Sequence, residues 1–154
     1  NDVFLDPFCG SGTIPIERAA YPASSIIGGD ISLEAVDAAR RNAPENVHIR
    51  HMDACELEGI APQSVSAIVT NLPWGKQIAP DEDIEALYSK FLLATRRVLK
   101  ADGRAIMLTD QEEALGQACR RAQLVCQPLH KISLHGSLAV IYRIRPHDSS
   151  GVAD

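Results

Sequence analysis

Short hydrophobic runs alternate with amphipathic stretches along almost the whole chain. The runs are rich in branched aliphatic residues, which favour a buried strand, and the amphipathic stretches repeat their apolar positions at helical spacing. Strands are expected at about residues 2–6, 25–30, 47–50, 65–70, 104–109, 124–134 and 138–145. Helices are expected at about residues 13–21, 33–43, 84–101 and 111–121. Alternation of this kind predicts an α/β fold with a mostly parallel sheet.

The chain closes with a different pattern. Only His135, Gly136 and Ser137 separate the last two expected strands, and so short a link can join only antiparallel neighbours. We therefore expect a seven-stranded, mostly parallel sheet with a C-terminal antiparallel hairpin. An ordinary dinucleotide-binding half would not end in this way. Residues 1–146 are expected to form this single domain, and the polar segment 147–154 a flexible tail.

The composition narrows the classes of partner and compartment. The chain has 154 residues, which is the size of one domain, and no apolar run long enough to span a bilayer. Its four cysteines and five histidines are scattered without metal-ligand spacing, which predicts reduced thiols in a cytoplasmic protein and no metal site. The net charge of −5 implies that an RNA partner would need another domain, or a local basic face, to hold its phosphates.

Polar residues stand where each of the first four expected strands ends. They are Asp6, Asp30, Asp53 and Asn71. The carboxyl ends of parallel strands meet at one edge of the sheet, and ligands bind there beside the point where the strand order reverses. We therefore expect these four side chains to surround a ligand site, although strand-end turns could account for one or two of them.

The turn after the first strand indicates which ligand this site takes. Gly10 and Gly12 let the backbone approach a ligand closely, but Pro15 replaces the third glycine of the dinucleotide fingerprint and no lysine follows for a phosphate loop. Asp6, at the mouth of the loop, would repel phosphate and attract a ligand with an ammonium and a sulfonium. Asp30 is placed to accept both ribose hydroxyls. These features favour S-adenosylmethionine.

The turn after the fourth strand suits methylation of a flat exocyclic amine. The side-chain oxygen of Asn71 and the carbonyl of Leu72, held ahead of Pro73, can each accept one amine hydrogen. Trp74 offers a face on which a base can stack. The alternatives are a turn-forming Asn71 and a core Trp74. The turn has no cysteine, which argues against methylation of a pyrimidine carbon.

These residues carry a family resemblance. The segment from Asp6 to Glu17 closely resembles the first motif of the THUMP-associated RNA guanine-N2 methyltransferases, and the segment from Asn71 to Gly75 is similar to that family's Asn/Asp-x-Pro-aromatic motif. The resemblance implies a Rossmann-like class I S-adenosylmethionine methyltransferase fold. It also implies methyl transfer to the N2 amine of a guanine, with tRNA favoured over ribosomal RNA as the substrate. It further implies an N-terminal THUMP domain that holds the RNA. We therefore expect this chain to be a piece of a longer protein, and we expect the piece to lack the THUMP domain and an N-terminal helix.

The resemblance also assigns residues to the site. The expected catalytic residues are Asn71, Leu72, Pro73 and Trp74. The expected cofactor-binding residues are Asp6, Phe8, Cys9, Gly10, Ser11, Gly12, Thr13, Asp30, Ile31, Asp53, Ala54 and Asn71. Cys9 is expected to pack as a small side chain rather than to react. The second motif is shared with adenine-N6 and glutamine methyltransferases, so those acceptors stay open, as does a non-catalytic module that binds S-adenosylmethionine or RNA.

Overall fold

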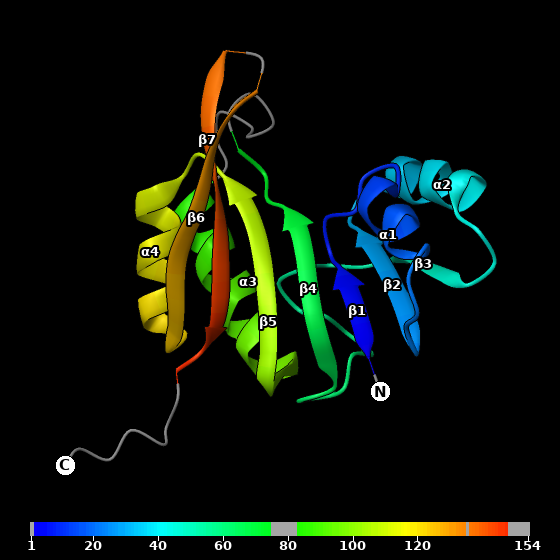
Figure 1. The fold of residues 1–154 in the computed structure, drawn as a ribbon, viewed down its shortest axis with the longest axis horizontal. Coiled ribbons are helices and arrows are strands. Elements are labelled where there is room, and N and C mark those ends of the chain that lie inside the picture. Colours follow the sequence, from blue (N-terminus) through cyan, green and yellow to red (C-terminus); the bar gives the residue numbers. More distant parts are fainter. Residues whose placement is uncertain (1, 75–82, 135, 148–154) are drawn as a thin grey trace.

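A seven-stranded sheet forms the centre of the domain in the computed structural model (Figure 1), which describes residues 2–74, 83–134 and 136–147. In chain order the elements are β1 (Val3–Asp6), α1 (Thr13–Arg18), β2 (Ser25–Asp30), α2 (Leu33–Asn42), β3 (Val47–His51), β4 (Val65–Asn71), α3 (Ile84–Val98), β5 (Leu99–Thr109), α4 (Glu112–Arg121), β6 (Leu124–Leu134) and β7 (Ser137–Pro146). The predicted alternation is therefore confirmed.

The strand order is β3-β2-β1-β4-β5-β7-β6. The first five strands are parallel, and β7 runs antiparallel to both β5 and β6. This confirms the predicted C-terminal hairpin. The strand order reverses between β1 and β4, so a crevice for a ligand is expected at their carboxyl ends. At this edge β6 and β7 extend past the end of β5, whose last residue, Thr109, pairs with Val140 (Figure 1).

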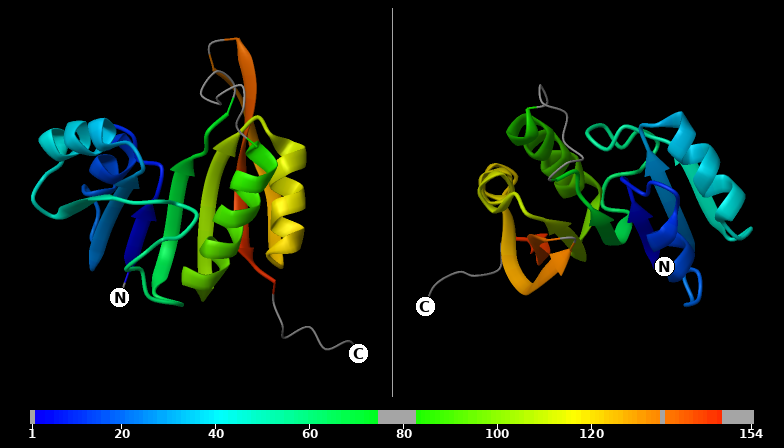
Figure 2. Two further views of the ribbon diagram at one scale, coloured as in Figure 1. Left: turned by 180° about the vertical axis from the view of Figure 1, so that it is seen from behind. Right: turned by 90° about the horizontal axis from the view of Figure 1, so that it is seen from above.

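Alternate residues of the strands face two separate hydrophobic layers. Leu5 and Ile27 belong to the larger layer, which also holds the buried faces of α3 and α4. Phe4 and Ile26, one residue earlier in each strand, belong to a smaller layer on the other face. This is the period-two alternation of a strand that is covered on both faces. Figure 2 shows α3 and α4 side by side on one face of the sheet.

Two predicted helix ends were wrong. The first helix ends at Arg18 rather than at about residue 21, because the Ala20 and Tyr21 amides donate to carbonyls three rather than four residues earlier. The apolar pattern predicted that the helix from residue 84 runs to about 101, but α3 ends at Val98 and Leu99 already belongs to β5. Leu99 pairs with Val65, and the register then shifts so that Ala67 pairs with Arg104. The extra residues form an irregularity of the strand in which a Cβ on Gly103 would lie 2.9 Å from the Leu99 side chain. Strand pairing, which periodicity cannot detect, decides this boundary.

Local capping signals agree with the structure. Ser32 precedes α2 as predicted, and its side chain accepts a hydrogen bond from the Ala35 amide at 3.3 Å. Asp83 caps α3 in the same way through the Ala86 amide at 3.0 Å. Across the described ranges, none of the helices is long and apolar enough to cross a membrane. Except for His147, the predicted flexible tail lies outside the described residues.

Candidate active site

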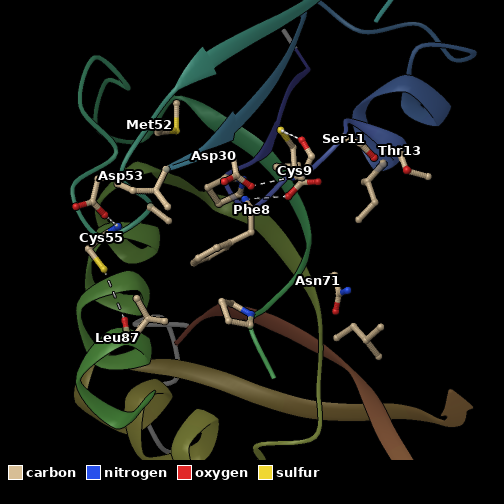
Figure 3. A pocket seen from close by; sticks show the side chains of 18 residues that line it. Phe8, Cys9, Ser11, Thr13, Asp30, Met52, Asp53, Cys55, Asn71 and Leu87 are labelled. Carbon is tan, nitrogen blue, oxygen red and sulfur yellow. Dashed lines mark hydrogen bonds between the residues drawn. The ribbon is translucent and has the colours of Figure 1, made fainter. Parts of the chain in front are cut away.

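A cavity of about 930 Å³ opens at the carboxyl ends of β1, β2 and β4 (Figure 3). This volume is typical of a site for a cofactor-sized ligand. Of the residues expected to bind the cofactor, those that line it are Asp6, Phe8, Cys9, Gly10, Ser11, Thr13, Asp30, Ile31, Asp53, Ala54 and Asn71. Pro73 lines it as well, whereas Gly12, Leu72 and Trp74 are not among the described lining residues. Folding thus brings together Asp6 and Asn71, which lie 65 residues apart in the sequence.

The loop between β1 and α1 depends on two glycines with different roles. Gly10 and Gly12 have φ angles of +52° and +93°, in the left-handed region that favours glycine. A Cβ on Gly10 would meet nothing within 4 Å, so only its backbone conformation requires glycine. A Cβ on Gly12 would lie 3.2 Å from both Ala39 and Ile16. Gly12 therefore allows the end of this loop to lie close against α2 and shapes the cavity indirectly.

Asp30 joins the ends of the first two strands. Its Oδ2 accepts a hydrogen bond from the Gly10 amide at 3.0 Å, and its Oδ1 accepts one from the Ser32 amide at 2.9 Å. The side chain is half-buried and points into the cavity (Figure 3). Each carboxylate oxygen has about two acceptor sites, so one remains on each oxygen for a ligand hydroxyl.

Asp6 lies deeper than its sequence position suggested. It was expected at the mouth of the loop, but its side chain is completely buried below it. Oδ1 accepts hydrogen bonds from the Thr70 hydroxyl at 2.7 Å and from the Phe8 amide at 3.2 Å. Oδ2 is buried without a hydrogen-bond partner among the described residues. An orphaned acceptor in a cavity wall is a place where a ligand can donate a hydrogen bond.

The same burial changes the charge expected at Asp6. Burial raises its pKa from 3.8 to about 7, and repulsion from Asp30 adds to this, while the hydrogen bonds from Thr70 and Phe8 oppose it. Near neutral pH the carboxyl group therefore changes its protonation state easily. Burial likewise raises the pKa of the Cys9 thiol to about 12, with Asp6 and Asp30 adding to the effect. Cys9 thus stays protonated at neutral pH, which agrees with a packing role.

The far side of the cavity combines one acid with apolar groups. Asp53 is exposed and its Oδ1 accepts a hydrogen bond from the Cys55 amide at 2.8 Å, while Ala54 is buried between them. Ile31 lines the cavity although it is 63% exposed. An apolar side chain left open to water in this way offers a surface for a flat ring. Leu87 of α3 and Cys55 lie near each other on this side (Figure 3).

The turn after β4 is held from several directions. Asn71 accepts a hydrogen bond on its Oδ1 from the Trp74 indole nitrogen at 2.7 Å. The Leu72 side chain is completely buried and its amide donates to the Leu108 carbonyl at 3.1 Å. The Tyr88 hydroxyl donates to the Pro73 carbonyl at 2.7 Å. Asn71 Oδ1 keeps one acceptor site, and Trp74 has an orienting contact that its sequence position did not reveal.

Several contributors to the site were missed from the sequence: Met52, Cys55, Leu87 and Leu108 line the cavity, and two buried hydroxyl groups support it. Thr70 was counted only as a strand residue, and Tyr88 only as part of the apolar stripe of α3. Both are buried and donate hydrogen bonds to residues of the site. A hydroxyl within an otherwise apolar stripe was the available signal, because a buried hydroxyl needs a partner. Phe91 of α3 is a further support, since it packs edge-on against Phe8 with ring centroids 5.0 Å apart.

The fold and the site together define a Rossmann-like domain of the class I methyltransferase type. The chain belongs to the UPF0020 family, the RMKL-like methyltransferase domain, whose match covers residues 1–139. It is 26% identical over 172 residues to a tRNA (guanine(6)-N2)-methyltransferase of Archaeoglobus fulgidus, covering 92% of this chain and 43% of the relative. It is 33% identical over 135 residues to the enzyme of the same name from Thermus thermophilus, covering 80% of this chain and 40% of the relative.

A solved structure is similar over the same region. TrmN from Thermus thermophilus superposes with a TM-score of 0.79 at 26% identity, covering 95% of this chain and 44% of that chain. The chain thus spans less than half the length of each of these three proteins. The similarity therefore concerns part of a longer chain in each case.

Proposed function

We propose that this domain binds S-adenosylmethionine and transfers its methyl group to the N2 amine of a guanine in RNA, with tRNA as the substrate. One observation carries the proposal. The Asp6 to Thr13 loop, the acids Asp30 and Asp53, and the Asn71 turn all line one cavity of about 930 Å³. Such a cavity can hold a cofactor and present its reactive end to a substrate.

The chemistry of the lining suits this cofactor. S-adenosylmethionine carries an ammonium, a ribose and a flat adenine, and when bound it supplies a methyl group on a sulfonium. The unpartnered Oδ2 of Asp6 can accept from the ammonium, and the remaining acceptor sites of Asp30 suit ribose hydroxyls. Ile31 and Ala54 provide apolar surface for the adenine. No lysine or arginine lines the cavity among the described residues, which favours this ligand over a phosphate.

The residues of the Asn71 turn would act by positioning. The remaining acceptor site on Asn71 Oδ1 and the carbonyl of Leu72 would each accept one hydrogen of the guanine amine. With both hydrogens held, the nitrogen lone pair would be free to form the new N–C bond as the S–C bond breaks, and the amine would release one of its two hydrogens as a proton. Holding a reactant in one orientation can lower a barrier by several kcal/mol without an acid or base, on the order of 7 kcal/mol in favourable cases. A guanine within a helix would first have to flip out of its stack.

The choice of guanine and tRNA rests on the relatives. The archaeal and bacterial proteins at 26% and 33% identity are both named for methylation of guanine N2 in tRNA. The net charge of −5 indicates that this domain does not supply most of the phosphate affinity. We therefore assign RNA capture to a further RNA-binding domain of the full-length protein.

The test uses the full-length protein with unmodified tRNA and S-adenosylmethionine labelled on its methyl group. Digestion to nucleosides and mass spectrometry should give labelled N2-methylguanosine. Labelled N6-methyladenosine, or label only in a glutamine-containing peptide substrate, would move the activity to one of the other acceptors. Tight cofactor binding by calorimetry without transfer to any of these substrates would instead indicate a non-catalytic binding module.

A further inference from the structure

A chain of buried hydroxyl groups lies behind the Asn71 turn, outside the lining of the cavity. It consists of Tyr88 on α3 and Thr109 at the end of β5, and both side chains are completely buried. The two oxygens lie 2.7 Å apart. The Tyr88 hydroxyl also lies 2.7 Å from the Pro73 carbonyl oxygen, and the Gln111 amide donates to Thr109 Oγ1 at 3.0 Å.

The direction of each hydrogen bond follows from the donors available. A carbonyl oxygen can only accept, so the single hydroxyl proton of Tyr88 points to Pro73. The contact between the two hydroxyls must then use the proton of Thr109, and Thr109 Oγ1 in turn accepts from the Gln111 amide. Every proton thus points toward the turn, from the start of α4 to the Pro73 carbonyl. Aligned bonds of this kind strengthen one another in a dry interior.

The hydrogen bond at the end of this series of hydroxyls orients more of the turn than the Pro73 carbonyl alone. The Pro73 carbonyl belongs to the planar peptide unit that joins Pro73 to Trp74. A hydrogen bond that orients this carbonyl therefore also orients the Trp74 backbone nitrogen and Cα, which lie in the same plane. The Trp74 indole then donates to Asn71 Oδ1 at 2.7 Å. A path of covalent and hydrogen bonds therefore runs from Tyr88 to the oxygen that would hold the substrate amine.

We infer that Tyr88, supported by Thr109, is a positioning residue for the Asn71 to Trp74 turn. It acts through the Pro73 carbonyl and the Trp74 indole, and it touches neither cofactor nor substrate. The inference rests on the proposed function for its catalytic consequence. Its structural part, the dependence of the Trp74 indole on the Tyr88 hydroxyl, stands without it.

The first measurement reads the turn directly. Trp74 is the single tryptophan of the chain, and protein labelled with 5-fluorotryptophan gives it a ¹⁹F resonance that Trp74→Phe identifies. Tyr88→Phe keeps the buried ring and removes only the hydroxyl, so the resonance should shift or broaden. Tyr142→Phe is the matched control, because Tyr142 is a buried tyrosine of the same hydrophobic layer on β7, and it should leave the resonance in place.

The second measurement reads the reaction. Tyr88→Phe should lower kcat by about 10- to 100-fold, because displacing a reactant by about 1 Å can lower the rate by about 100-fold. The KM for tRNA and the Kd for S-adenosylmethionine should stay within about twofold, since Tyr88 is not among the described residues that line the cavity. A general loss of folding would instead impair binding together with turnover. Thermal unfolding of each variant identifies this case.

Two substitutions at Thr109 keep the inference testable if Tyr88→Phe does not fold. Thr109→Val removes the hydroxyl at nearly constant shape, and Thr109→Ser restores it. The expected kcat order is parent and Thr109→Ser highest, Thr109→Val lower, and Tyr88→Phe lowest. An unchanged ¹⁹F resonance with kcat within twofold of the parent in Tyr88→Phe would overturn the inference, as would an equal loss in Tyr142→Phe. If the parent methylates no RNA, the proposed function fails, and the resonance alone still tests the link between Tyr88 and Trp74.

Discussion

The buried carboxyl of Asp6 should make the stability of the domain depend on pH. Its pKa is about 7 in the folded protein and near 3.8 when exposed, because burial disfavours the charged form. The folded state therefore holds the proton more tightly than the unfolded state. The bound proton therefore contributes to the free energy of unfolding. This contribution is fully present below about pH 3.8 and is lost as the pH rises through about 7.

The size of the effect follows from the two pKa values. They differ by about 3 units, and each unit corresponds to about 1.4 kcal/mol. Between pH 4 and pH 8 the parent should therefore lose about 4 kcal/mol of unfolding free energy through this one group. Asp6→Asn has nearly the same shape and cannot ionise, and its amide oxygen can still accept from Thr70 and Phe8.

The assay is urea unfolding followed by circular dichroism at several pH values from 5 to 8.5. As the pH rises, the variant Asp6→Asn should become more stable relative to the parent. The difference in their unfolding free energies should change by up to about 1.4 kcal/mol per pH unit below pH 7. Glu45→Gln removes one exposed carboxylate and controls for the change in net charge. A difference that stays constant across this range would refute the argument for a buried, easily protonated Asp6.

Three further predictions follow from the same geometry. If Asp6 accepts from the ligand ammonium, S-adenosylmethionine should bind more weakly as the pH falls below 7, by up to about tenfold per unit, and calorimetry on Asp6→Asn should show no such trend. Asn71→Ala should lower turnover by at least about 100-fold while Kd for the cofactor stays nearly constant; normal turnover would exclude Asn71 as the amine acceptor. Gly12→Ala should destabilise the domain by about 1–3 kcal/mol because φ is +93° and the new Cβ meets Ala39 at 3.2 Å. In Gly116→Ala, the control within α4, the Cβ has no neighbour closer than 3.6 Å, so thermal unfolding should show no loss.

The strands, the helices and the edge where the site forms could all be predicted from local patterns. Burial on two faces gives continuous apolar runs, and the Ser32 cap is a short-range signal, so both are visible in a few neighbouring residues. Parallel strands also place their carboxyl ends together, which is why Asp6, Asp30 and Asn71 could be assigned to one cavity before the fold was known.

Features that depend on contacts between distant segments could not be predicted in this way. Leu99 joined β5 because it pairs with Val65, although its helical spacing placed it in α3. The burial of Asp6 depends on the layers of the fold that close over it, so the sequence indicated a carboxylate and gave no sign of its raised pKa. Periodicity reports which residues are apolar, but it does not report which strand or hydroxyl each one meets.

The sequence by itself determined the class of fold, the edge of the sheet that holds the cavity, and the residue types available there. Only the tertiary structure decided how those residues are held. It buried Asp6 against Thr70, gave Asn71 its contact with Trp74, and set Tyr88 behind Pro73. The physical reason is that the position of a polar group is set by its hydrogen-bond partners, and in a folded domain these come from parts of the chain that are remote in sequence.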